Sequence, residues 1–172
     1  MSETLPSADA RETALYNRFQ ALGIAYKTYA HPPVFTVEES ASIKETIPGG
    51  HTKNLFLKDK KGGLWLVVVD AQRRVDLNAL AKQLDAPRFS FGSAELLVAT
   101  LGITPGSVTP FALINDTTRQ VRPVLDAEML KNNPVNYHPL RNDRTTSVTP
   151  DDLVRFIEAL GYQPVIAGIP EK

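Results

Sequence analysis

The amino-acid sequence predicts a single α/β or α+β domain built on a sheet with mixed strand directions. The 172 residues fit one domain and allow a sizeable core. Hydrophobic residues make up 42% and charged residues 22% of the chain, as is typical of globular proteins. About seven short strand patterns and five helix patterns alternate along the chain, which favours this fold class.

The N-terminal third is expected to hold a helix, a strand and a second helix. Ser7 can cap the first helix, whose apolar residues recur at i, i+4 and i+7, and Gly23 ends it. Residues 24–30 alternate in polarity as a two-faced strand does. Thr36 and Glu39 form a capping-box pattern, which predicts a second, short helix.

A hairpin and two helices are expected next. Residues 53–58 and 64–70 read as strands joined by a Lys/Gly-rich loop. The second strand contains three consecutive valines without alternation, so both of its faces should be covered. Asp76 and Ser93 each precede an apolar pattern with helical spacing and can cap a helix.

The C-terminal half is expected to hold further strands and a closing helix. Strand patterns occur at 111–115 and 119–126, and residues 134–149 contain one or two more. Thr149 and Pro150 occupy the N-cap and first position of the last helix.

Several function classes are disfavoured by what the sequence lacks. The chain has no cysteine and three scattered histidines, so metal binding and thiol chemistry are not expected. It has no G-x-S-x-G elbow, P-loop or G-x-G-x-x-G motif. No apolar run reaches the roughly 18 residues that cross a bilayer, and residues 1–13 do not resemble a secretory signal. We therefore expect a cytoplasmic protein without a membrane partner.

Charge is distributed unevenly along the chain. The formal net charge is zero, with 19 basic and 19 acidic residues. Residues 51–90, however, hold eight Lys/Arg and four Asp, a local balance of +4. Such a segment can contact a phosphate-bearing ligand, or its hairpin lysines at 58, 60 and 61 can simply be solvated.

Three local features are more polar or more constrained than a structural role requires. Lys53-Asn54 opens a strand that continues with apolar residues, so the lysine either reaches water or faces a cavity. The loop 106–110, GSVTP, can present backbone N–H groups to an oxyanion, or can be an ordinary loop. The segment 136–146, NYHPLRNDRTT, gathers His, Asn and Thr and can equally be a hydrogen-bonded turn.

These features occur together and in this order in one known family. The sequence resembles the YbaK/ProX aminoacyl-tRNA deacylases, relatives of the editing domain of prolyl-tRNA synthetases, over roughly residues 10–167. Within that family it is most similar to the free-standing Ala-tRNA(Pro) deacylases of the ProXp-ala or PrdX type. The resemblance rests on TKNLFLKDKKGGLWLVVV, VDLNALAKQL, RFSFGSAELL, LGITPGSVTPFALIND and VNYHPLRNDRTTSVTPDDLVRFI.

The resemblance implies a fold, a reaction and a set of catalytic residues. The fold would be a compact α/β domain around a mixed, partly barrel-like sheet with flanking helices, spanning residues 10–172 after a flexible N-terminus at 1–9. The reaction would be hydrolysis of the 3′-terminal ester of a mischarged tRNA, without metal or cofactor. The residues that match the family's functional positions are Lys53, Asn54, Gly106 and His138.

Two further groups of residues are expected to contact the substrate. An alanine-sized pocket must exclude proline sterically, because one methyl group offers only about 1–3 kcal/mol of attraction. Its predicted walls, around the His-Pro-Pro connector, can also be plain core and are Tyr29, Val34, Phe35 and Val37. The residues expected to bind the tRNA acceptor stem are Arg73, Arg74, Lys82 and Arg88.

Two alternatives stay open on the sequence. The substrate can instead be a Cys-, Ser- or Thr-tRNA, or the chain can be a non-catalytic module that binds tRNA or a synthetase. In either case the expected partner is tRNA and not DNA, with prolyl-tRNA synthetase or an elongation factor as a transient second partner.

Overall fold

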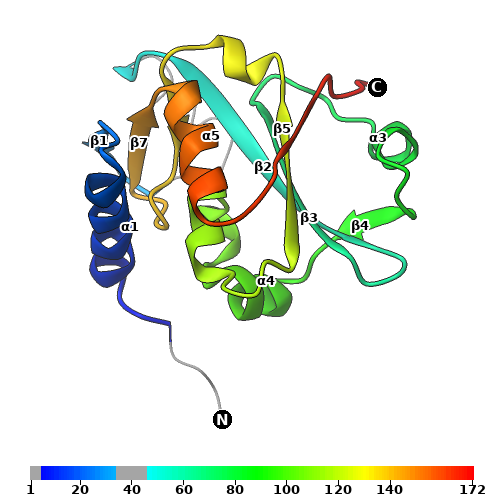
Figure 1. Cartoon of the computed structure of the whole chain (residues 1–172), viewed down its shortest axis with the longest axis horizontal. Helices are drawn as coiled ribbons and strands as arrows, with labels where there is room; N and C mark the ends of the chain where they lie inside the picture. The colour runs from blue at the N-terminus through cyan, green and yellow to red at the C-terminus, as the bar shows by residue number, and fades with distance from the viewer. Residues whose placement is uncertain (1–4, 34–45) are drawn as a thin grey trace.

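The computed structural model describes residues 5–33 and 46–172 and shows a sheet with helices packed against it. Eight strands form a mixed sheet in the order β1-β7-β6-β2-β3-β5-β8, and β4 pairs with β2 beside this path (Figure 1). The predicted fold class is therefore confirmed. The strands are β1 (Lys27–Ala30), β2 (Gly50–Asp59), β3 (Leu64–Asp70), β4 (Phe89–Phe91), β5 (Val121–Asp126), β6 (Val135–Tyr137), β7 (Arg144–Val148) and β8 (Val165–Ala167).

Helices lie on both faces of this sheet and at its ends. Strand pairs β2–β6, β3–β5 and β5–β8 are parallel, and β1–β7, β6–β7, β2–β3 and β2–β4 are antiparallel. No described helix is long and apolar enough to cross a membrane. The described helices are α1 (Ala8–Leu22), α3 (Leu77–Gln83), α4 (Ala94–Leu101), α5 (Pro150–Ala159) and the 3₁₀ helices η1 (Pro105–Ser107), η2 (Pro110–Asn115) and η3 (Met129–Lys131).

Strand β2 is the junction of the sheet. Along one edge it pairs with β3 from Thr52 to Lys58. Along the other edge it pairs with β6 at residues 50–51 and with β4 at residues 57–59. Between these two pairings, residues 52–56 have no ladder partner among the described strands on that side. We call this stretch the open edge of β2.

A glycine pair makes the β2–β6 junction possible. Gly49 has φ +101°, and a Cβ there would collide with the carbonyl oxygen of Pro134. The Gly50 N–H donates to the same carbonyl at 2.9 Å. Such a close approach of two backbones needs residues without side chains. The glycines before Lys53 therefore hold β6 against the start of β2.

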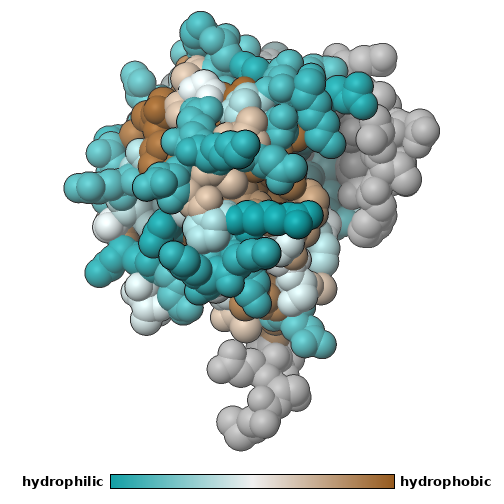
Figure 2. All heavy atoms as spheres, turned by 90° about the vertical axis from the view of Figure 1, so that its right-hand side faces the viewer, coloured by the Kyte–Doolittle hydropathy of each residue, from teal (hydrophilic) through white to brown (hydrophobic). Residues whose placement is uncertain are grey.

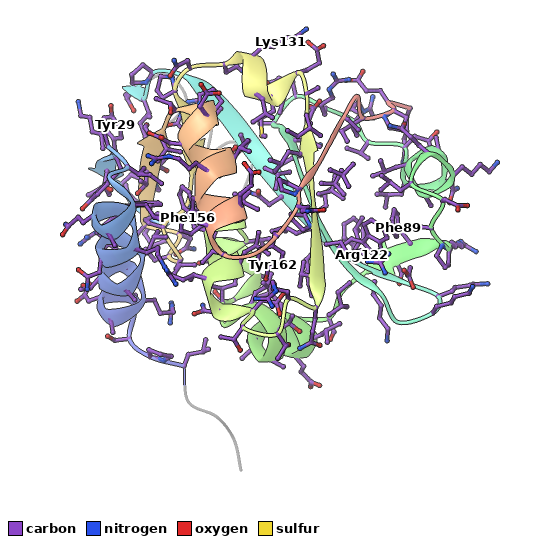
Figure 3. The ribbon with its side chains drawn as sticks, in the orientation of Figure 1. Tyr29, Phe89, Arg122, Lys131, Phe156 and Tyr162 are labelled. Carbon is purple, nitrogen blue, oxygen red and sulfur yellow. The ribbon has the colours of Figure 1, made fainter. Side chains whose placement is uncertain are left out.

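The two faces of the sheet carry separate cores. On one face, α1, α4 and α5 cover a cluster in which Phe19, Phe111 and Phe156 lie edge to face, with centroids 5.1–5.7 Å apart (Phe156 is labelled in Figure 3). On the other face, α3 covers a smaller cluster that includes Leu57 and Trp65. Strand β3 contributes to both cores, and its three valines are fully buried, as expected.

The predicted helix starts are confirmed. The side chains of Ser7, Asp76, Ser93 and Thr149 each accept a hydrogen bond from a backbone N–H of the helix that follows. Gly23 ends α1 in the left-handed conformation. The short helix expected after Thr36 lies outside the described residues.

The strand expected at 111–115 is wrong, because this segment is the 3₁₀ helix η2. Pro110 occupies its first position and the Thr109 hydroxyl accepts from the Phe111 N–H, so the apolar run begins with a cap. Strands β4 and β8 did not stand out as separate strands in the sequence, since each has only three residues.

Candidate active site

Lys53 and Asn54 project from opposite faces of β2. Successive side chains of a strand alternate between the two faces of a sheet. Lys53 pairs with Val69, which belongs to the core under α3, whereas Asn54 pairs with Val68, which belongs to the core under α4 and α5. The two adjacent polar residues consequently enter two different cavities, and these meet at the open edge of β2.

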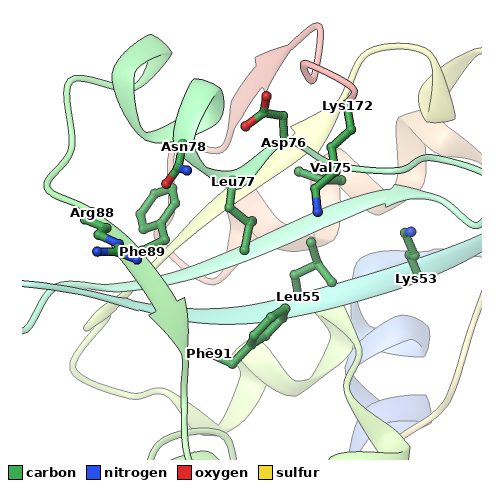
Figure 4. A pocket seen from close by; sticks show the side chains of 10 residues that line it. All are labelled: Lys53, Leu55, Val75, Asp76, Leu77, Asn78, Arg88, Phe89, Phe91 and Lys172. Atoms are coloured by element: carbon green, nitrogen blue, oxygen red, sulfur yellow. The ribbon is translucent and has the colours of Figure 1, made fainter.

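Lys53 lines a cavity of about 410 Å³, called here the Lys53 cavity. Figure 4 shows Lys53 and Lys172 toward one end of it, Arg88 at the other end, and apolar side chains between them. The one carboxylate side chain in the lining, that of Asp76, is engaged as the N-cap of α3. The lining thus combines an excess of positive charge with an apolar floor. The complete lining is Lys53, Leu55, Val75, Asp76, Leu77, Asn78, Arg88, Phe89, Phe91 and Lys172.

Asn54 lines a smaller cavity of about 170 Å³, called here the Asn54 cavity. Pro105 and Val108 line the same cavity, so the loop that contains Gly106 lies beside Asn54. The Asn54 side-chain oxygen is buried and has no hydrogen-bond partner within the part of the chain that the structure describes. A buried acceptor without a donor is costly, so the Asn54 oxygen is available to accept a hydrogen bond from a molecule bound in this cavity.

His138 follows β6 and is not among the residues that line either cavity. The β2–β6 register pairs His51 with Asn136, and its continuation would place His138 level with Lys53 on the same face of the sheet. The Nδ1 atom of His138 lies 3.0 Å from the Arg144 carbonyl oxygen. Burial lowers the pKa of His138, and the bond to Arg144 only partly opposes this. The neutral imidazole is therefore the form at neutral pH.

The ring of His31 lies beside that of His138, with their centroids 6.3 Å apart. Its Nδ1 lies 2.8 Å from the Pro32 carbonyl oxygen, and its Nε2 lies 2.8 Å from the Thr145 hydroxyl. A carbonyl can only accept, so Nδ1 carries a proton and the neutral ring accepts from Thr145 at Nε2. These two contacts hold the His31 ring in place beside His138.

The predicted pocket walls are only partly described by the structure. Tyr29 lies on β1, three strands from β2 in the sheet order. The Nζ atom of Lys27 lies over the Tyr29 ring, 5.0 Å from its centroid. In Figure 3 it lies on the opposite side of the molecule from Phe89, which lines the Lys53 cavity. Val34, Phe35 and Val37 lie outside the described residues. Their role as walls stays a prediction.

The four predicted tRNA-binding residues differ in their surroundings. Arg73 is half-buried and pairs with Asp126 at 3.2 Å and with Glu171 at 2.9 Å. Arg74 and Lys82 are exposed, and Arg88 is exposed at the edge of the Lys53 cavity. Arg88 is thus the member of this group that lines the same cavity as Lys53, at its other end, and all four assignments stay predictions.

Phe91 and Lys172 were missed by sequence reasoning. Phe91 is 64% exposed and lines both cavities. The pattern Phe89-Ser90-Phe91 puts both rings on one face of the strand, so it gave no local signal that Phe89 would be buried and Phe91 exposed. Lys172 carries no local signal, because it reaches the cavity only through the pairing of Glu171 with Val75. Within the described residues, no three His, Asp or Glu side chains come together as metal ligands would.

Comparison with known proteins identifies the family. A family model described as "Aminoacyl-tRNA editing domain" matches residues 31–156, which is most of the chain. The chain belongs to the aminoacyl-tRNA editing family of the YbaK/ProX type. The expected resemblance is thereby confirmed at the level of the family, and the match covers Lys53, Asn54, Gly106 and His138.

Individual members of the editing family are similar over most of their length. "Prolyl-tRNA synthetase associated domain-containing protein 1" of Danio rerio is 42% identical over 147 residues, 84% of this chain and 80% of the relative. "Prolyl-tRNA editing protein ProX" of Acetoanaerobium sticklandii is 34% identical over 154 residues, 89% of this chain and 93% of the relative. The similarity to named members of the editing family therefore extends over most of this chain.

A solved structure of the editing family shows the same fold. It is described as "a putative trans-editing enzyme for prolyl tRNA synthetase" and superposes with a TM-score of 0.72 at 22% identity, covering 97% of this chain and 99% of that one. At this identity the likeness supports the arrangement of the sheet and helices around β2.

Proposed function

We propose that this editing domain is a hydrolase that removes alanine from mischarged tRNA(Pro). The observation that carries the proposal is the arrangement at the open edge of β2, where a lysine enters a cation-rich cavity and a buried, unpartnered amide oxygen faces the Gly106 loop. A cationic cavity suits the phosphate-bearing 3′ end of a tRNA, and an unpartnered acceptor suits a donor on the amino acid or ribose. The family match supplies the class of reaction.

The proposed reaction is the hydrolysis of an ester that is already activated, so positioning is the main task. Water attacks the ester carbonyl carbon, the tetrahedral intermediate collapses, and the C–O bond to the tRNA ribose breaks. The ribose oxygen takes the proton that the water loses. Lys53 holds the terminal phosphate or the ester oxygen as a point charge, and the backbone N–H of Gly106 stabilises the oxyanion.

Asn54 and His138 have orienting roles in this proposal. The Asn54 side-chain oxygen accepts a hydrogen bond from the substrate, either from the α-ammonium group or from a ribose hydroxyl. Neutral His138, level with Lys53 by extension of the strand register, orients the attacking water or the α-amino group. The 2′-hydroxyl of the tRNA can assist the proton transfer, because the site offers no strong protein nucleophile among the described residues.

The choice of alanine rests on similarity to the editing family and on the size argument. The ProX relative is named for prolyl-tRNA editing, and its similarity to this chain supports tRNA(Pro) as the tRNA. Discrimination against proline requires a steric wall, which we assign to the predicted group Tyr29, Val34, Phe35 and Val37. A cytoplasmic location follows from the proposed encounter with charged tRNA.

The test is deacylation of purified Ala-tRNA(Pro), with Pro-tRNA(Pro) and Ala-tRNA(Ala) as the discriminating substrates. Ala-tRNA(Pro) should be hydrolysed much faster than the other two. Cys-, Ser- and Thr-charged tRNAs complete the panel. If Ala-tRNA(Pro) stays intact while one of these is hydrolysed, the amino-acid assignment is wrong and the reaction class stands.

Lys53→Ala tests the mechanism against a matched lysine on the same strand. Lys53→Ala should abolish deacylation, whereas Lys58→Ala should leave it unchanged, because Lys58 is exposed and lines neither cavity. Thermal unfolding of both variants checks that each is folded. Normal deacylation by Lys53→Ala would refute the assigned mechanism.

A non-catalytic role is the second candidate, because several relatives carry the name "associated domain-containing protein" without a stated activity. A binding module would retain tRNA or synthetase affinity and hydrolyse none of the substrates in the panel. The same assays therefore separate the two functions.

A further inference from the structure

Phe91 is an exposed aromatic side chain at the meeting point of two cavities. It is 64% exposed, more than the other two large hydrophobic residues on the described surface, Val165 at 40% and Ile166 at 51%. It lines both the Lys53 cavity and the Asn54 cavity, as does Leu55. The ring therefore lies on the wall that the two cavities share, with Leu55 between it and Lys53 in Figure 4.

The backbone holds Phe91 firmly in this place. Phe91 pairs with Leu57 in the β2–β4 ladder, and the next residue, Gly92, donates its N–H to the Phe56 carbonyl oxygen at 2.9 Å. A side chain at Gly92 would collide with the Phe56 ring. The exposed ring is thus fixed at its Cα by strand pairing, which limits the entropy lost when a ligand stacks on it.

The cavity beside this aromatic ring has cationic side chains at both ends, on the face of the molecule that carries α3, β4 and the C-terminus. Figure 2 views that face and shows apolar side chains in a strip bordered by hydrophilic ones. Around the Lys53 cavity the cations are Lys53, Arg88 and Lys172, and Figure 4 places Arg88 and Lys172 on different sides of the apolar floor. An aromatic ring among cations is the combination with which proteins bind single-stranded nucleic acid, stacking a base and pairing its phosphates.

We propose that Phe91 is the stacking platform for the 3′-terminal adenine of the tRNA, with Arg88 and Lys172 holding the flanking phosphates. This inference rests on the proposed function, because the nucleotide that carries the ester must lie within reach of Lys53 and Asn54. The ring lines both cavities, so the base on it belongs to the reacting nucleotide. Stacking is indifferent to the amino acid, so this contact fixes the tRNA end and leaves discrimination to the pocket walls.

A binding experiment tests the stacking without any need for hydrolysis. Phe91→Trp introduces an exposed indole, and its fluorescence should be quenched when uncharged tRNA(Pro) binds. A tRNA(Pro) whose terminal nucleotide is abasic should not quench it. Ile166→Trp, at another exposed apolar site that lines neither cavity, is the matched control and should not respond. An unchanged Phe91→Trp signal at saturating tRNA would overturn the proposal.

Removal of the ring gives the second readout. Phe91→Ala should weaken tRNA binding about tenfold and raise the KM of deacylation with little change in kcat, and Phe91→Trp should restore both. The abasic tRNA should bind wild type and Phe91→Ala equally. Lys172→Gln should make the logarithmic salt dependence of binding shallower by about 0.7, and Lys131→Gln, an exposed lysine outside the cavity, should not.

The outcomes separate this inference from the proposed function. Quenching at Phe91→Trp without any deacylation would remove the proposed activity and support the stacking contact. Deacylation by the wild-type protein would support the proposed activity. If Phe91→Ala then had the same KM as wild type, the stacking contact would be overturned.

Discussion

Replacement of Asn54 by leucine should make the protein more stable and a poorer enzyme. The side-chain oxygen of Asn54 is buried beside Pro105 and Val108 without a hydrogen-bond partner among the described residues. Leucine has a similar shape and needs no donor. An unsatisfied buried polar group costs about 1–3 kcal/mol, and the substitution removes this cost from the ligand-free protein.

The structure sets the expected magnitudes. A gain of about 1–2 kcal/mol corresponds to a rise in Tm of about 2–8 °C for a domain of this size. If the substrate supplies the missing donor, its loss should lower kcat/KM about tenfold or more, because hydrogen bonds that involve a charged group contribute about 1.5–3 kcal/mol. Stability and activity should therefore move in opposite directions.

Asn136 is the matched control for this experiment. It is also a buried asparagine next to β2, but its amide donates to the Pro48 and Gly50 carbonyl oxygens at 3.1 and 3.0 Å and accepts from Ser147. Asn136→Leu should cost about 3 kcal/mol, roughly 1 kcal/mol for each bond. Thermal unfolding and Ala-tRNA(Pro) deacylation are measured for both variants. A lower Tm for Asn54→Leu, or full activity, would refute the reasoning.

Two further predictions concern the β2–β6 junction and the pH dependence of stability. Gly49→Ala should lower the free energy of unfolding by about 2–4 kcal/mol, because it combines strained φ with a collision against Pro134, whereas Gly62→Ala meets open space and should cost only the strain, about 1–2 kcal/mol. Chemical denaturation compares the two, and equal losses would contradict the collision. Because burial lowers the pKa of His138, its contribution to stability is complete above the unfolded pKa near 6.5 and is lost as the pH falls below it. Between pH 5 and 8, the free energy of unfolding should change less with pH in His138→Gln than in wild type. Identical profiles would show that His138 does not contribute to the pH dependence of stability.

The sequence was sufficient for features that depend on local chemistry. Capping residues predicted the starts of four helices, because a side-chain acceptor at the N-cap is a local requirement. The valine run of β3 predicted a strand covered on both faces, because consecutive apolar residues point to both sides of a sheet. The order of the family motifs led to the editing family, which the comparisons confirmed.

Features that depend on distant parts of the chain were not predictable in this way. Lys172 joins the Lys53 cavity through a single bridge between Val75 and Glu171, nearly a hundred positions apart. Arg73 was expected to bind the tRNA acceptor stem, and its ion pairs with Asp126 and Glu171 could not be read from the neighbouring sequence. The apolar run at 111–115 suits a strand by composition, but it forms the 3₁₀ helix η2, whose start is capped by Thr109.

Because Lys53 and Asn54 are consecutive residues of one strand, the backbone of β2 fixes their side chains on opposite faces of the sheet. Their spacing is set by the pleat of an extended backbone and not by the choice of side chains around them. A one-residue insertion between Gly50 and Lys53 that shifted the register would exchange the two cavities, sending the ammonium to the Gly106 loop and the amide toward Arg88. Redesign of one cavity can leave the other unchanged if the length of β2 is kept and the shared wall of Leu55 and Phe91 is left intact.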